Sequence, residues 1–145
     1  MNGVEIRRLG SGEVELILAA SALFDEPAID EWASLFLNRQ GHHLLIAYLD
    51  ENPVGFISGV ETTHPDKGTE MFVYELAVTE AHRRHGIGQA LVAALTDIAR
   101  EKGCYGMWVG TEPGNIAAIS TYRSAGADAP EPFLTLSWTF AGTEQ

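Results

Sequence analysis

Cysteine is almost missing from this chain of 145 residues, since Cys104 is its single thiol. One cysteine cannot form an internal disulfide, so the disulfide-stabilised secreted scaffolds are excluded. The sequence also lacks a basic-then-apolar leader and any apolar stretch long enough to span a membrane. From these absences we expect a cytoplasmic protein with no membrane partner, in which Cys104 is a small core residue.

Basic residues are scarce: the chain has 9 lysines and arginines against 20 acidic residues, and its formal net charge is −11. This balance argues against nucleic acid as a partner, because phosphate backbones bind clustered cations. It favours a cationic small-molecule substrate, although acidity can also serve solubility alone. No repeat, low-complexity tract or linker divides the sequence, so we expect residues 1–145 to form one domain.

The stretch from Met71 to Leu95 carries the strongest pattern in the sequence. Residues 71–78 are mostly apolar, with the β-branched and aromatic side chains that are typical of a strand. From Gly88 onward, apolar residues recur three and four positions apart, which predicts an amphipathic helix. Gly103 is a natural stop for that helix.

The segment that joins this strand to this helix reads Arg83-Arg84-His85-Gly86-Ile87-Gly88. Glycines let backbone N–H groups approach a ligand, and the first N–H groups of a helix lack partners at the positive end of its dipole. Two arginines add positive charge, so we predict a phosphate or pyrophosphate site. It is no Walker P-loop, because no Gly-Lys-Ser/Thr follows. Nor is it the dinucleotide fingerprint, because Leu91 occupies the third glycine position. The alternative is an ordinary turn that contains glycines.

Two motifs in this half of the chain resemble those of the GNAT superfamily of N-acetyltransferases. The first is Arg83-x-x-Gly86-x-Gly88, which is similar to the superfamily's acetyl-CoA-binding signature. The second is similar to its Asn-x-x-Ala-x-x-Leu-Tyr-x-x-x-Gly motif and consists of Asn115, Ala118, Tyr122 and Gly126, with Thr121 in place of the leucine. The two motifs occur in the expected order, separated by a helix and a strand.

The remaining pattern predicts an α/β fold. We expect further strands over residues 4–9, 43–49, 54–60, 105–111 and 133–140, and further helices over residues 12–23, 27–40 and 115–125. Residues 62–69 are expected to form a loop. The resemblance implies a mixed, mostly antiparallel sheet that splays after the central strand to admit the cofactor and is flanked by about four helices.

Glu75 is a charged residue within an otherwise apolar predicted strand. Buried strands rarely carry an unpaired carboxylate, so Glu75 is a candidate general base that faces a cleft and accepts the proton of an amine, directly or through water. GNAT enzymes often use an acid on this strand in that role. The alternative is a solvated or arginine-paired glutamate.

The resemblance places Tyr122 beside the sulfur of CoA, where its phenol would protonate the departing thiolate. The alternative is a core tyrosine on a helix face. Asn115 would bond the pantetheine arm, and asparagine is also a common helix N-cap. In full, the resemblance implies that acetyl-CoA binds through Leu76, Ala77, Val78, Arg83, Arg84, His85, Gly86, Ile87, Gly88, Gln89, Asn115 and Ala118. We expect no metal, because His82 and His85 lie in the loop without a set of ligands.

A narrower resemblance, to the aminoglycoside 3-N-acetyltransferases of the GNAT type, is carried by Arg8-Leu9-Gly10, by residues 22–26 and by residues 73–84. It implies an aminoglycoside acceptor, acetylated at the 3-N position, with Asp25, Glu26 and Glu112 as candidate substrate-binding acids. Two alternatives stay open. One is a GNAT enzyme for a polyamine or a protein amino terminus, and the other is a non-catalytic acyl-CoA-binding module. A homodimer is possible on either interpretation.

Overall fold

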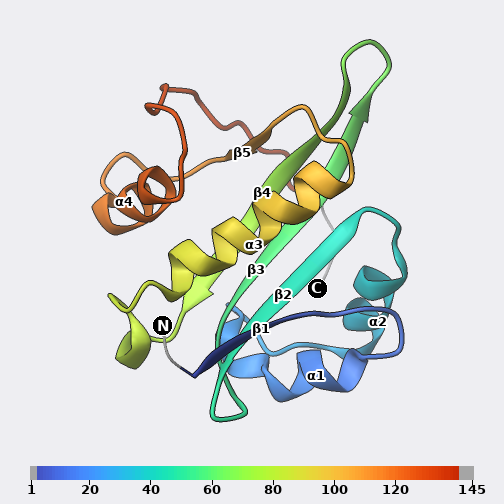
Figure 1. Ribbon diagram of the computed structural model, residues 1–145. Helices are drawn as coiled ribbons and strands as arrows, with labels where there is room; N and C mark the ends of the chain where they lie inside the picture. The colour runs from blue at the N-terminus through green and yellow to red at the C-terminus, as the bar shows by residue number, and fades with distance from the viewer. Residues whose placement is uncertain (1–2, 141–145) are drawn as a thin grey trace.

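The computed structural model describes residues 3–140, which form one sheet with helices on both of its faces (Figure 1). The strands are β1 (Val4–Arg8), β2 (His42–Leu49), β3 (Asn52–His64), β4 (Gly68–Val78) and β5 (Met107–Val109). The helices are α1 (Val14–Ala19), α2 (Asp30–Asn38), α3 (Ile87–Glu101) and α4 (Ile116–Ser124), with short 3-10 helices at Ser21–Leu23 and Glu80–His82. Among the described residues, no helix is both long and apolar enough to cross a membrane.

The sheet has the strand order β1-β2-β3-β4-β5. The first four strands are antiparallel neighbours, and β5 runs parallel to β4. The expected mixed, mostly antiparallel sheet is therefore confirmed.

The sheet is splayed between β4 and β5. Only Met71, Phe72 and Val73 of β4 pair with β5, and they pair with Met107–Val109. In the second half of β4, residues 75–78 keep their pairing with β3, but no strand of the described chain pairs with residues 74–78 on the β5 side. This opening after the central strand is the one that the family resemblance implies.

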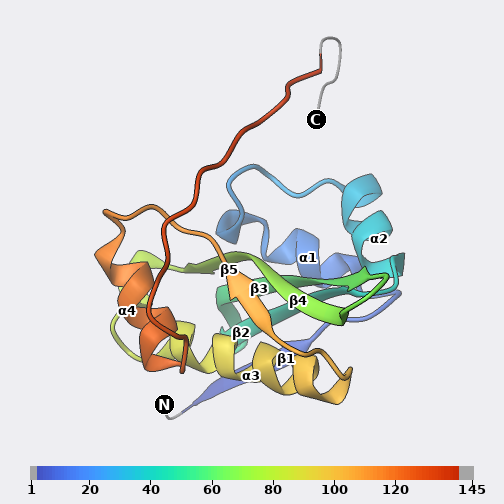
Figure 2. The same cartoon turned by 90° about the horizontal axis from the view of Figure 1, so that it is seen from above.

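Two hydrophobic clusters lie on the two faces of the sheet. Figure 2 shows the helices that cover them, with α1 and α2 on one side of the sheet and α3 on the other. On one face α3 packs through buried residues such as Leu91 and Leu95, spaced as the predicted amphipathic helix requires. On the other face α1 and α2 pack over Leu44, Ile46 and Phe56. The opening between β4 and β5 is therefore flanked by one helical layer on each side.

Three expectations differ from the structure. Residues 62–69 are not a loop, because β3 and β4 pair as far as His64 and Gly68 and leave only a tight turn between them. The predicted strand over residues 105–111 is limited to β5. The predicted strand over residues 133–140 is extended but pairs with no other described strand, and its side chains are exposed.

Candidate active site

A β-bulge in β4 sets the direction of Glu75. Glu75 pairs with Ser58 of β3, whereas the next residue of β3, Gly59, pairs with Val73, so Tyr74 is an extra residue on β4. Side chains alternate between the faces of a strand, and Val73 belongs to the α3 side. The extra residue changes this alternation and turns Glu75 toward the α2 side. The charged residue in the apolar strand is thus removed from the core.

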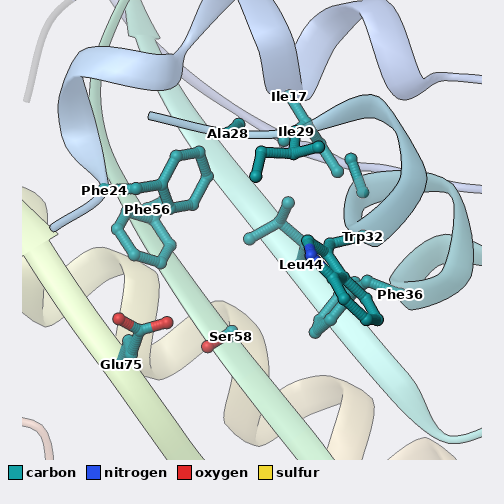
Figure 3. Close-up of a pocket in the computed structure, with 11 residues that line it drawn as sticks. Ile17, Phe24, Ala28, Ile29, Trp32, Phe36, Leu44, Phe56, Ser58 and Glu75 are labelled. Atoms are coloured by element: carbon teal, nitrogen blue, oxygen red, sulfur yellow. The ribbon is translucent and has the colours of Figure 1, made fainter. Parts of the chain in front are cut away.

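Glu75 faces an open pocket of about 180 Å³ between the sheet and α2 (Figure 3). Its carboxylate and the Ser58 hydroxyl form the polar end of the pocket, while the walls are apolar. The other lining residues are Ile17, Phe24, Ala28, Ile29, Trp32, Ala33, Phe36, Leu44 and Phe56. An apolar cavity with few convergent polar groups has the character of a small-molecule site.

The environment of Glu75 favours its protonated form. Partial burial raises the pKa of the Glu75 carboxyl, and the nearby negative charge of Asp25 raises it further. None of the ion pairs found among the described residues includes Glu75, so the alternative of an arginine-paired glutamate is not supported. A carboxylate whose pKa is shifted toward neutrality is suited to proton transfer at working pH.

Tyr122 lies on the opposite face of the sheet. Its half-buried ring packs with the α3-side cluster, and burial raises the pKa of its phenol. Its neighbour Thr121 lies beside the opened half of β4, because a Cβ built on Gly88 would be 3.2 Å from Thr121, 3.8 Å from Val78 and 3.9 Å from Leu76. The raised pKa keeps the Tyr122 hydroxyl protonated, and the helix that carries it passes beside the opening at Thr121.

The loop that precedes α3 has the backbone form that the glycine motif predicts. Gly86 is the N-cap of α3 with φ of +80°, and Arg84 also has a positive φ, +67°. Within the described chain, no backbone carbonyl accepts from the N–H groups of residues 84–89. These free N–H groups at a helix N-terminus, with exposed arginines, fit a phosphate group. The Nε of Arg83 also donates to the carbonyl of Val78 at 3.1 Å, which fastens the loop to the end of β4.

The other predicted cofactor residues come together around α4. Asn115 is its N-cap, and its Oδ1 accepts from the N–H of Ala118 at 3.1 Å. The side-chain amide of Asn115 retains its donors for a ligand. Gln89 has a structural bond, because its Nε2 donates to the carbonyl of Ser124 at 3.1 Å and joins α3 to the end of α4.

The three acidic residues predicted to bind the substrate do not all lie near the pocket. Asp25 lies close enough to Glu75 to affect its pKa, and Glu26 is exposed beside it. Glu112 lies in the loop before α4 and does not line the pocket. The aromatic wall of Phe24, Trp32 and Phe36 was missed as a site. Trp32 and Phe36 of α2 have the helical spacing of core residues, so the sequence carries no signal that a cavity lies beside them.

The chain belongs to the GNAT acetyltransferase family, whose model matches residues 14–127. N-acetyltransferase 8B of Rattus norvegicus is 27% identical over 109 residues, which make up 74% of this chain and 49% of that protein. The ribosomal protein bS18 alanine N-acetyltransferase of Escherichia coli strain K12 is 29% identical over 91 residues, 63% of this chain and 60% of that protein. The chain thus spans about half the length of the first curated relatives it matches.

Solved structures agree on the fold. An aminoglycoside acetyltransferase from an uncultured soil metagenomic sample, in complex with sisomicin, matches with a TM-score of 0.88 and 22% identity, over 96% of this chain and 97% of that one. The aminoglycoside N-acetyltransferase AAC(6')-Iy in complex with CoA matches with a TM-score of 0.76 and 19% identity, over 93% and 94%. One is a metagenomic enzyme and the other is of the 6′ type, so neither name specifies the 3-N group.

Proposed function

We propose that this chain is an acetyl-CoA-dependent N-acetyltransferase that acts on a primary amine. One observation carries the proposal: Glu75 faces the pocket on the α2 side of the sheet, Tyr122 packs on the α3 side, and the glycine loop with free N–H groups follows the strand of Glu75. A reaction between a thioester and an amine needs a proton acceptor on the amine side and a proton donor on the sulfur side. Family membership supports this division of roles.

Acetyl-CoA would supply the activated acetyl group as a thioester. The free N–H groups of residues 84–89 would hold its pyrophosphate, and the unpaired half of β4 would bond its pantetheine amides. A backbone N–H of β4 would polarise the acetyl carbonyl. Glu75 would take a proton from the acceptor ammonium, directly or through water, and the neutral amine would attack the thioester carbon to form the C–N bond. As the C–S bond breaks, the Tyr122 hydroxyl would give its proton to the departing thiolate and regain one from the nitrogen, which loses its second proton as the amide forms.

We propose an aminoglycoside as the acceptor, acetylated at the 3-N position. The two neighbouring structures described above are aminoglycoside acetyltransferases, and the family resemblance around Glu75 favours the 3-N group. The charge of the chain supports a cationic acceptor, because the negative charge of Asp25 acts on Glu75 in the pocket and the whole chain carries −11.

The pocket wall favours a second acceptor class. A cavity lined by Phe24, Trp32 and Phe36 would bury an apolar group next to the amine. The amino terminus of a peptide with an apolar first side chain has this form. The relative from Escherichia coli, named for an alanine of a ribosomal protein, is consistent with this candidate.

A CoA-release assay across a panel decides between these functions. The panel contains aminoglycosides with and without a free 3-amine, polyamines, and peptides with apolar or charged first residues. Product NMR would locate the acetyl group on the 3-N or the 6′-N. Release with a gentamicin-type substrate at 3-N supports the first acceptor, and release with apolar peptides alone supports the second. Acetyl-CoA binding without release from any amine would contradict the enzyme function and favour an acyl-CoA-binding module.

A further inference from the structure

The hydroxyl of Ser58 has no hydrogen-bond partner within the part of the chain that the structure describes. Ser58 is only 4% exposed, and none of the side-chain hydrogen bonds found among residues 3–140 includes it. Buried hydroxyls in folded proteins nearly always have a partner, because an unmade hydrogen bond is costly away from water. Ser58 lines the pocket beside Glu75, so its partner must come from the pocket, as water or as part of a ligand.

Ser58 and Glu75 form a pair of polar groups at one end of the pocket. They are directly opposite each other in the pairing of β3 with β4. Such cross-strand neighbours have Cβ atoms about 4.5–5.5 Å apart. Figure 3 shows the oxygen of Ser58 on the side that faces Glu75. A ligand with two polar atoms on neighbouring carbons can therefore contact both side chains at once.

The two groups differ in what they bind. Glu75 in its ionised form attracts a protonated amine and accepts its hydrogen bonds. The hydroxyl of Ser58 is neutral and can both donate and accept, so it suits an oxygen atom of the ligand. The walls next to this pair, such as Phe56 and Leu44, are apolar. A further charge placed against them would lose its hydration without gaining a partner.

We propose that the pocket binds a primary amine that has an oxygen on the neighbouring carbon, with the amine at Glu75 and the oxygen at Ser58. This inference rests on the proposed function, since it takes Glu75 as the group that receives the acceptor amine. The amino terminus of a peptide has this arrangement, because its carbonyl is next to the amine-bearing carbon, and so do amino sugars. A polyamine lacks the oxygen and would displace water from Ser58 without replacing its hydrogen bond, so Ser58 selects against it.

A matched pair of amines tests the role of Ser58. The probes are leucinol and its deoxy analogue, in which a methyl group replaces the hydroxymethyl group beside the amine-bearing carbon. Calorimetric titration of the full chain in the presence of CoA, which has no acetyl group to transfer, is expected to give leucinol an affinity about 5- to 100-fold higher. Ser58→Ala removes only the hydroxyl and is expected to make the two affinities nearly equal. Equal affinities in the wild type, binding of neither probe, or an unchanged preference in Ser58→Ala overturns the proposal.

Two further variants show whether a loss of preference is specific to the Ser58 hydroxyl. Ser58→Thr keeps a hydroxyl and places a β-branched residue in a strand, so it is expected to retain the preference for leucinol. Ser34→Ala removes a hydroxyl of α2 that donates to Asp30 and does not line this pocket, so it is expected to retain the preference too. Thermal unfolding checks that each variant is folded. Loss of the preference in folded Ser34→Ala contradicts the assignment of the oxygen to Ser58.

CoA release from acetyl-CoA with the same two amines separates this inference from the proposed function. A preference for leucinol in binding, with no acetyl transfer to any amine, would contradict the enzyme and support recognition by Ser58. Transfer to both probes at equal kcat/KM would support the enzyme and overturn the inference. In the acceptor panel described above, release with an aminoglycoside or with a peptide identifies the source of the oxygen, whereas a polyamine acetylated as fast as either overturns the proposal.

Discussion

Glu75 of β4 pairs with Ser58 of β3 immediately beside a β-bulge, and both side chains face the pocket between the sheet and α2. Because the bulge adds one residue to β4, the strand can give Met71 and Val73 to the core on the α3 side and still present a carboxylate to the other face. The chemistry of the site therefore depends on backbone geometry as much as on residue type.

Glu75→Gln is expected to lower kcat/KM for the amine by about 10²–10⁴-fold, because the amide keeps the shape of the side chain but cannot accept a proton. In the wild type, burial and Asp25 raise the pKa of Glu75, so activity should increase as the pH passes through this raised value. The variant should lose that limb of the pH profile. Glu112→Gln, outside the pocket lining, is the control. An equal decrease in kcat/KM for the two variants would show that Glu75 is not the general base.

The same Glu75→Gln change should alter stability with a definite sign. Because the folded-state pKa is raised, the folded chain binds more protons than the unfolded chain between the two pKa values, and stability falls as pH rises through that window. Glutamine does not titrate, so the variant should melt at a higher temperature than the wild type at neutral pH. The difference should disappear in acid.

Glu13 provides the opposite case for the same melting experiment. The Gly10 N–H and the Arg7 guanidinium lower the pKa of its carboxyl, so its contribution is present at neutral pH and lost as pH falls. Glu13→Gln should therefore melt lower than the wild type at neutral pH. Shifts of the same sign for the two variants would contradict this account.

Tyr122→Phe should lower kcat by about 10²–10⁴-fold and leave acetyl-CoA affinity unchanged, since only the proton donor is lost. Calorimetry and single-turnover kinetics separate the two quantities. Tyr105→Phe, at an exposed position, removes an equivalent hydroxyl elsewhere and should have no effect on either. An unchanged rate with Phe at 122 over the whole pH range would leave this tyrosine with a packing role alone.

Gly86→Ala should weaken acetyl-CoA binding by about tenfold. A Cβ at φ of +80° costs about 1–2 kcal/mol and disturbs the N–H groups of the loop. Gly103→Ala is a closely matched control. Gly103 has φ of +77° at the other end of α3, with no atom within 4 Å of the added Cβ. Both variants should lose similar stability in denaturant, and only the first should lose affinity. A parallel loss of affinity would contradict the assignment of the loop.

Trp32→Ala should raise the KM of the acceptor by about tenfold while the KM of acetyl-CoA stays constant, because Trp32 forms part of the pocket wall. Leu35→Ala on the same helix is the control, since Leu35 is 41% exposed and does not line the pocket. If the two variants behave alike in acceptor titrations, the pocket is not where the amine binds.

The sequence predicts the parts of this fold that depend on local periodicity. The central strand, α3 and the glycine loop appear where their patterns place them, because apolar spacing and helix-terminal N–H groups are local properties. The β3–β4 hairpin was missed at Thr62 and Thr63. The turn residues between His64 and Gly68 suggested a wide loop, whereas the β-branched threonines pair up to the turn.

The bulge and the pocket could not be predicted in this way. One extra residue at Tyr74 is visible only when β3 and β4 are paired, because it is a relation between two strands. Periodicity assigns Trp32 and Phe36 to an inner face but cannot say whether a neighbour fills the space in front of them. The segment of residues 133–140 has the alternation of a strand, but alternation does not identify the strand that pairs with it.

The unpaired half of β4 has a consequence beyond the reaction. Within residues 3–140, no strand pairs with the side of residues 74–78 that faces the opening. A ligand that forms hydrogen bonds there binds the folded state and not the unfolded state. Such a ligand adds about 2.7 kcal/mol to folding stability at one hundred times its dissociation constant. Amide hydrogens along this edge should therefore exchange slowly when acetyl-CoA is plentiful and quickly when it is depleted. The free energy of unfolding would then rise with the concentration of acetyl-CoA.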